Sequence, residues 1–219
     1  MLEMVHRPGS LLTELGVVID AANRVHVNFA QAERIHVHHT QMPVAGTAYA
    51  LASPPFSRGM FPDFSLLRLV AKRPSMDGRE ARALAAVCGV TIDNPDGRGS
   101  ASFVAHLHDV LDRYPMGSFF HRDPSRAING IDVRPRGVNP RTDEVELHAM
   151  IAWRRAYRDL WDVEQMMVAT VLCLYRGDVD KIWLRTCPCK WHVADAIPAL
   201  NDAGFLQDWG KLVALYLGW

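Results

Sequence analysis

The sequence predicts a mainly helical α+β protein, with a mixed N-terminal part followed by an all-helical C-terminal bundle that contains a helix-turn-helix-like unit. Three observations lead to this fold class. Alternating apolar residues occur near residues 24–40, proline and glycine gather in residues 121–141, and apolar residues recur every three or four positions from Met150 onward. We expect a mixed domain over 1–120, a basic linker or arm over 121–141 and a helical domain over 142–219.

The composition is that of an ordinary globular protein. Of the 219 residues, 49% are hydrophobic and 22% are charged. A chain of this composition can form a hydrophobic core without disulfides or structural metal ions. The 24 basic and 24 acidic side chains cancel, and this excludes the strongly basic class of nucleic-acid coat proteins. The charge balance does not exclude a protein that binds DNA through a local basic patch, or one that binds another protein.

The first element is predicted to be a helix that Ser10 caps and that continues to Val25. Residues 24–27 and 34–37 resemble each other and alternate, so they are either two strands of a hairpin or a continuation of the helix. The recurring Val, Ile and Phe favour strands. The segment 43–62, rich in Pro, Gly, Ala and Ser, predicts a loop or irregular arm.

Capping signals define the next helices. Residues 64–71 are apolar and short, and they predict a strand or a helical turn. Asp77 and Glu80 form a capping-box pattern for a helix that stops near Gly89. After a turn-rich loop over 93–99, a further helix is expected to begin at Ser100 or Ser102 and to end before Pro115.

The segment 121–141 is the most basic of its length in the chain. Its prolines and glycines predict no regular structure, and its five arginines against two aspartates give a net charge of +3. If the protein meets nucleic acid, these arginines are the expected phosphate contacts; they are Arg122, Arg126, Arg134, Arg136 and Arg141.

Helical spacing dominates the remaining chain. Asp143 with Glu146 resembles a capping box, and one apolar face continues from Met150 to Leu174. Asp162 with Gln165 offers a second cap, so this run is one helix or two. An apolar helix that contains Leu212, Val213, Leu215 and Leu217 is expected to close the chain.

Residues 178–197 have the outline of a helix-turn-helix, with a break at Cys187-Pro188-Cys189. Pro188 excludes an uninterrupted helix through this turn. The candidate contacts to nucleic acid in this segment are Arg185, Lys190, Trp191 and His192.

The residues Glu164-Gln-Met-Met, then Leu174-Tyr-Arg-Gly177, Ile182 and Val193 resemble the DNA-binding region 4 of sigma factors. The pattern is also similar to the helix-turn-helix of some phage antitermination regulators. This resemblance, over about 40 residues, implies DNA contact by the second helix and RNA polymerase or another protein as a partner. The expected function is therefore regulation of transcription, with no catalytic residues.

Two features favour other functions. Residues 143–219 hold eight basic and eleven acidic side chains, a net charge of −3, which opposes phosphate binding. Pro198 interrupts the second helix eight residues after Lys190. The alternatives are a protein-binding regulator or inhibitor that does not touch nucleic acid and, beyond it, an enzyme, although no nucleophile elbow, phosphate loop or dinucleotide fingerprint occurs.

Two groups of residues are candidate metal ligands. Cys187, Cys189 and His192 supply three donors for zinc, but the one-residue gap between the cysteines is shorter than structural zinc sites use. Two unligated thiols are the alternative, and no cofactor is otherwise expected. His36 and His38, with His26 on a neighbouring strand, form a second group that is either a metal site or a solvent-facing row.

The sequence contains no segment with the length and apolar character of a membrane span. The N-terminus also lacks a signal peptide pattern. We therefore expect a cytoplasmic protein without a membrane partner.

Overall fold

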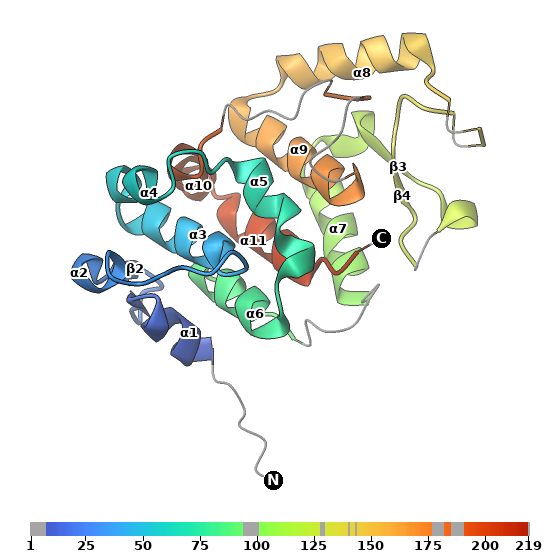
Figure 1. Ribbon diagram of the computed structural model, residues 1–219. Helices are drawn as coiled ribbons and strands as arrows, with labels where there is room; N and C mark the ends of the chain where they lie inside the picture. Colours follow the sequence, from blue (N-terminus) through green and yellow to red (C-terminus); the bar gives the residue numbers. More distant parts are fainter. Residues whose placement is uncertain are drawn as a thin grey trace.

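The computed structural model describes residues 8–93, 101–127, 130–139, 141–142, 144–176, 182–184 and 191–218. Within these ranges the chain forms eleven α-helices, three short 3-10 helices and two antiparallel two-stranded sheets (Figure 1). The predicted class, mainly helical α+β, is confirmed.

The chain begins with a short helix and a hairpin. Helix α1 (Pro8–Glu14) is followed by β1 (Val17–Ile19) and β2 (Val25–Val27), which pair antiparallel. The prediction of one helix to Val25 was wrong, because Gly16 leaves the helical region with φ +68° and the chain turns back. The Asp20 carboxylate stabilises the hairpin turn by accepting the backbone N–H groups of Ala22 and Arg24.

A strand over 24–27 is confirmed, but its predicted pairing with 34–37 was wrong. Its partner is β1, and residues 34–37 belong to no strand. The short helix α2 (Phe29–Ala32) follows the hairpin, with Asn28 accepting a hydrogen bond from the Gln31 backbone as its N-cap.

The predicted loop over 43–62 was also wrong, because these residues form α3 (Met42–Ala52) and α4 (Pro54–Met60). Helix α3 is buried on nearly every side, so its sequence lacks the polar face that marks an amphipathic helix. The prolines do not interrupt these helices, because they lie in the first turns, where the missing N–H costs nothing. Ser53 ends α3 and caps α4.

The next helices confirm the capping signals. Residues 64–71 adopt the helical alternative as α5 (Leu66–Ala71), and the 3-10 helix η1 (Arg73–Ser75) follows. Helix α6 (Gly78–Val87) begins with the predicted capping box of Asp77 and Glu80. Helix α7 (Ala101–Arg113) also forms as predicted, whereas most of the loop expected over 93–99 lies outside the described residues.

The basic segment is more regular than predicted. After the 3-10 helix η2 (Met116–Ser118), β3 (Phe120–Arg122) pairs antiparallel with β4 (Val133–Pro135), and the short η3 (Pro124–Arg126) lies between them. Pro135 was one of the residues that predicted irregular structure. It is the last residue of β4, where it does not interrupt the hydrogen bonds between the two strands.

Four helices make up the described C-terminal part. The run from Met150 to Leu174 is two helices, α8 (Leu147–Asp159) and α9 (Asp162–Arg176), and they precede α10 (Val193–Asp202) and α11 (Leu206–Leu215). Glu146 is the N-cap of α8, so the capping box proposed for Asp143 was misplaced, and Asp143 lies outside the described residues.

The helix-turn-helix outline is not reproduced at Ile182, Trp183 and Leu184, which form a bend instead of a helical turn. The break itself, with Cys187, Pro188 and Cys189, lies outside the described residues. The second helix of the predicted unit corresponds to α10, which His192 caps.

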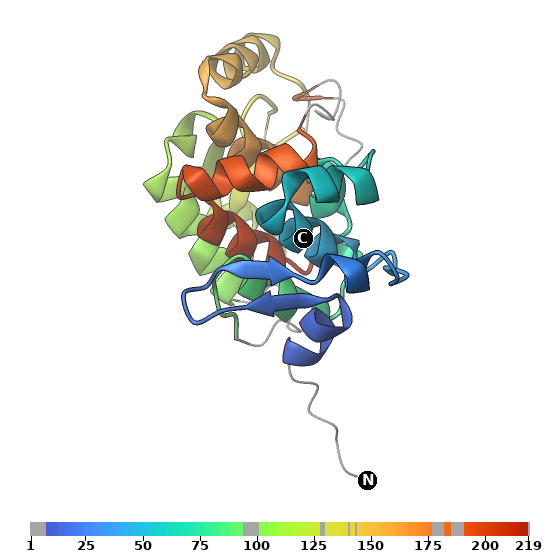
Figure 2. The same cartoon turned by 90° about the vertical axis from the view of Figure 1, so that its left-hand side faces the viewer.

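One hydrophobic core extends from Leu11 to Tyr216, across the predicted domain boundary. Helix α10 packs on α3 and α4, and α9 packs on α5. Helix α11 packs on both α6 and α7, so it lies between the N-terminal helices and α7 (Figure 2). Cys88 and Cys173 are buried in this core, as predicted. None of the described helices is long and apolar enough to cross a membrane.

Candidate functional site

The arginines predicted to contact phosphate are mostly engaged within the protein. Arg134 is buried and donates to the carbonyl oxygens of Ile131 (3.3 Å) and Val133 (2.8 Å). Arg136 donates to the carbonyls of Gly117 and Phe120, and Arg122 pairs with the Asp112 carboxylate at 2.8 Å. These side chains stabilise the β3–β4 hairpin. Arg141 is exposed, and Arg126 belongs to η3.

Helix α10 offers little that suits nucleic acid. Trp191 is only 5% exposed, and the exposed side chains of α10 are Asp195, Asn201 and Asp202. Acidic side chains repel phosphates, and Asp195 already pairs with Arg58 at 2.5 Å. Arg185 and Lys190 lie outside the described residues.

The proposed zinc ligands are not brought together within the described residues. His192 uses both ring nitrogens: Nδ1 accepts from the Ala194 N–H (3.0 Å), and Nε2 therefore carries the proton and donates to the Phe61 carbonyl (2.8 Å). Cys187 and Cys189 lie outside the described ranges.

The second histidine group is also dispersed. His26 contacts Asp20 at 3.0 Å, whereas the rings of His36 and His38 meet edge to face at 5.7 Å. The His26 contact is the main reason why the pKa of Asp20 lies below its usual range. No three potential metal ligands cluster among the residues that the structure places.

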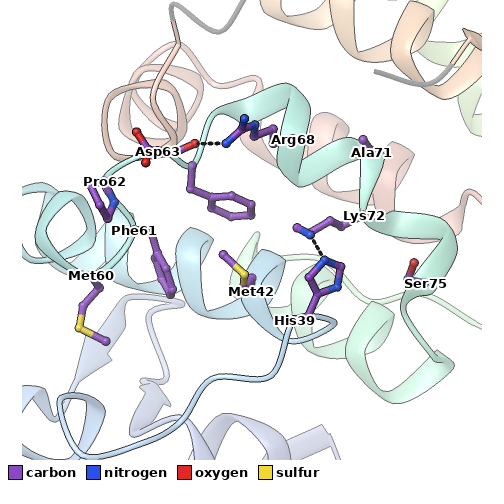
Figure 3. Close-up of a pocket in the computed structure, with 11 residues that line it drawn as sticks. His39, Met42, Met60, Phe61, Pro62, Asp63, Arg68, Ala71, Lys72 and Ser75 are labelled. Carbon is purple, nitrogen blue, oxygen red and sulfur yellow. Dashed lines mark hydrogen bonds between the residues drawn. The ribbon is translucent and has the colours of Figure 1, made fainter. Parts of the chain in front are cut away.

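A cavity of about 540 Å³ lies beside α5, and its size is typical of small-molecule sites. Three segments form it: the chain that enters α3, the chain that leaves α4, and α5 with η1 (Figure 3). Its lining is His39, Met42, Met60, Phe61, Pro62, Asp63, Phe64, Arg68, Ala71, Lys72 and Ser75.

Helix α5 places two cations on one side of this cavity. Arg68 and Lys72 are four residues apart, and this spacing puts them on one helical face. Arg68 donates to the Asp63 backbone carbonyl at 3.0 Å, and Lys72 makes a short hydrogen bond to His39 (Figure 3). Because a lysine ammonium only donates, His39 must accept through an unprotonated Nε2. Among the Lys, Arg, Asp and Glu side chains of the lining, the two cations exceed the single carboxylate, Asp63, by one charge.

The opposite side of the cavity is apolar. Phe61 stacks on Tyr49 with ring centroids 6.0 Å apart and lies 5.8 Å from Phe64. Tyr49 is buried and donates to the Leu15 carbonyl; burial raises its pKa to about 12, so the phenol stays neutral. Phe64 in turn lies directly on Gly46, where a Cβ would approach its ring to 2.9 Å. The apolar side of the cavity therefore packs directly against α3.

A short antiparallel contact fixes the cavity wall to α10. The Leu66 N–H donates to Trp191, and the Val193 N–H donates to Phe64, both at 2.9 Å. Together with the bond from His192 to Phe61, these contacts hold residues 61–66 against residues 191–193.

An adjoining hollow of about 290 Å³ lies beside the same wall. It shares Pro62, Asp63 and Arg68 with the main cavity and adds Ser65 and His192. Of the candidate contact residues that the structure describes, only His192 lines either cavity. The segment 178–197 thus contributes to the site through its histidine.

No pattern in the sequence predicts the cavity as a whole. Its lining comes from residues 39–75, where α3 and α4 were expected to be a loop. The four-residue spacing of Arg68 and Lys72 is visible in the sequence. It indicates a site only when α5 is known to be a helix and when Met42 and Phe61 are known to lie across the cavity from it.

Comparisons with protein-family models, with curated proteins and with solved structures find no match for this chain.

Proposed function

We propose that this chain is a binding protein for a small anionic molecule that also carries an aromatic or other apolar part. The proposal rests on one observation: the lining of the cavity beside α5 is cationic on one side and apolar on the other. Arg68 and Lys72 lie along one side, and Met42, Met60 and Phe61 provide the apolar surface. Such a cavity recognises charge and apolar area at once.

The chemistry of the lining favours an anion over a cation or a neutral polar molecule. A guanidinium and an ammonium both donate charge-assisted hydrogen bonds to carboxylate, sulfonate or phosphate oxygens. The two methionines are flexible and polarizable, and they adapt to apolar groups of different shape. His39, which accepts a bond from Lys72, positions that ammonium at the cavity.

Regulation of transcription through residues 178–197 stays a prediction. Among the described residues no observation favours it, since α10 exposes Asp195 and Asp202 and the arginines Arg122, Arg134 and Arg136 serve the β3–β4 hairpin. RNA polymerase as a partner likewise stays a prediction.

The experiment is a fluorescence titration with 8-anilinonaphthalene-1-sulfonate, an aromatic anion that combines both chemistries. We expect saturable binding with one site for each chain. Arg68→Gln and Lys72→Gln should each weaken binding by about tenfold, because each removes a charge-assisted hydrogen bond worth about 1.5 kcal/mol.

Arg24→Gln is the matched control, since Arg24 is an exposed arginine on the β1–β2 turn that does not line the cavity. Its affinity for the probe should equal that of the unaltered protein. Competition by naphthalene-1-sulfonate, but not by naphthalene itself, is expected. Equal affinity in all three variants would mean that the probe binds elsewhere and that the proposal is wrong.

A further inference from the structure

Exposed apolar side chains gather around α8. Of the six large hydrophobic residues that are most exposed among the described ones, four lie between residues 145 and 161. Leu147 is 64% exposed, Ile151 is 54% exposed, and Trp161, which follows the helix, is 78% exposed. A cluster of this kind on a folded protein marks a contact surface.

The two apolar residues of α8 and two of its arginines lie on one side of the helix. Ile151 follows Leu147 by four residues, and Arg155 and Arg158 follow Ile151 by four and seven. This spacing keeps all four on neighbouring positions of one face. We call Leu147, Ile151, Arg155 and Arg158 the α8 surface. All four are exposed, while the opposite face is anchored in the core by Met150, Trp153 and Tyr157.

Charge is distributed unevenly along this helix. The exposed Glu144 and Glu146 lie at its N-terminal end, and the exposed Arg155 and Arg158 lie near its C-terminal end. The exposed Asp159 also lies at the C-terminal end, four residues after Arg155 and on the side of that arginine away from Arg158. The nearby Arg154 is directed inward, where it donates to the carbonyls of Trp183 and Ile182.

We propose that the α8 surface is a self-association site at which a second copy of this chain packs its own α8 antiparallel across a two-fold axis. With the axis at Ile151, Leu147 of each copy meets the aliphatic stem of Arg155 of the other copy. The same axis brings the acidic N-terminal end of α8, with Glu144 and Glu146, beside the end of the other copy that carries Arg155 and Arg158, once at each end. A two-fold interface joins one patch to itself, so a surface that is acidic at one end and basic at the other is complementary to its own antiparallel copy.

The net charge of the chain agrees with this arrangement. Because 24 basic and 24 acidic side chains cancel, two copies approach without overall repulsion. A contact made by one helix of 13 residues is small, so the association should be reversible and dependent on concentration.

Sedimentation velocity of the full chain, from micromolar to millimolar concentration, tests the proposal. We expect a monomer–dimer equilibrium that weakens at high salt. Ile151→Asp should weaken it by at least about tenfold, because it places two carboxylates at the axis. Val18→Asp is the matched control, since Val18 is equally exposed but lies on β1, and it should leave the equilibrium unchanged.

Charge exchange gives the sharper test. A variant with Arg155→Glu and Arg158→Glu is acidic at both ends of α8, and a variant with Glu144→Arg and Glu146→Arg is basic at both ends. Each alone should be monomeric, and their mixture should form a heterodimer. Thermal melting of each variant confirms that it is folded. A monomer at every concentration, or a dimer that none of these changes weakens, overturns the proposal; so does a mixture that remains monomeric.

Discussion

Arg73 caps the last turn of α11 by donating from Nη2 to the carbonyl oxygen of Ala214 at 2.9 Å, although the two residues are 141 positions apart. Its Nε lies 3.1 Å from the carbonyls of both Val213 and Ala214, and its Nη1 donates to Met76. The side chain is only 1% exposed. A buried guanidinium thus satisfies carbonyl groups that a helix end leaves without intrahelical partners, and its charge complements the helix dipole.

Arg73→Met should lower the free energy of unfolding by about 3 kcal/mol, because it removes several hydrogen bonds from a buried charged donor to backbone carbonyls. Arg73→Lys should lower the free energy of unfolding by less than Arg73→Met, because the lysine ammonium still donates to some of these carbonyls although it lacks the planar set of donors of a guanidinium. Urea unfolding measures both. Arg24→Met, at an exposed arginine, serves as the control and should change stability by less than about 0.5 kcal/mol. A loss in Arg73→Met no larger than in this control would contradict the capping role.

Gly210→Ala should destabilise the protein by about 3 kcal/mol. A Cβ at this position of α11 would lie 2.3 Å from the Cβ and 2.5 Å from the Sγ of Cys88, so α6 and α11 would have to separate. Gly59→Ala is the matched control in α4, where nothing lies within 4 Å of the added carbon. It should raise stability by about 0.5–1 kcal/mol, the usual gain of alanine over glycine in a helix. Thermal melting of the pair decides, and equal melting temperatures would refute the close approach.

Stability should fall as the pH is lowered from about 7 to about 5. Burial lowers the pKa of His106 below its ordinary value, against the opposing effect of its hydrogen bond to the Asp208 carbonyl (3.0 Å). The unfolded chain therefore takes up a proton at a higher pH than the folded chain, and acid favours unfolding. His106→Gln, which keeps a donor for Asp208, should flatten this dependence, whereas His38→Gln, at an exposed histidine, should not. Urea midpoints across this pH range provide the measurement.

His192→Asn and His192→Ala should separate the two roles of this histidine. Asparagine is a good N-cap, so the first variant should preserve α10 while it loses the bond to Phe61. We expect faster hydrogen exchange in residues 61–66 and weaker binding of the sulfonate probe. The alanine variant loses the cap as well and should unfold about 1 kcal/mol more easily. If exchange in 61–66 is unchanged in both variants, His192 does not hold the cavity wall.

Local signals predicted the elements that they encode directly. The capping box of Asp77 and Glu80 lies within four residues, and it located the start of α6. The apolar spacing of α11 likewise predicted a helix, because its buried apolar residues recur at helical intervals. Neither inference needed information from distant parts of the chain.

Non-local packing accounts for what the sequence did not predict. Helix α3 reads as a loop because burial on all sides removes the polar face by which a helix is recognised. The hairpin partner of β2 was misassigned because residues 17–19 are all apolar and fitted the helix predicted from Ser10, whereas residues 34–37 alternate as a strand does. The cavity was missed because Arg68, Met42 and Phe61 come from three segments that only the tertiary fold brings together.

The pairing of residues 64–66 with residues 191–193 has a consequence for how the protein is made. During synthesis the ribosome releases the first partner more than a hundred residues before the second. Closing so long a loop costs entropy that only late contacts recover. The wall beside α5 therefore acquires its final support near the end of translation, and nascent chains that stop after α9 should bind the sulfonate probe weakly even though every side chain lining the larger cavity is already present.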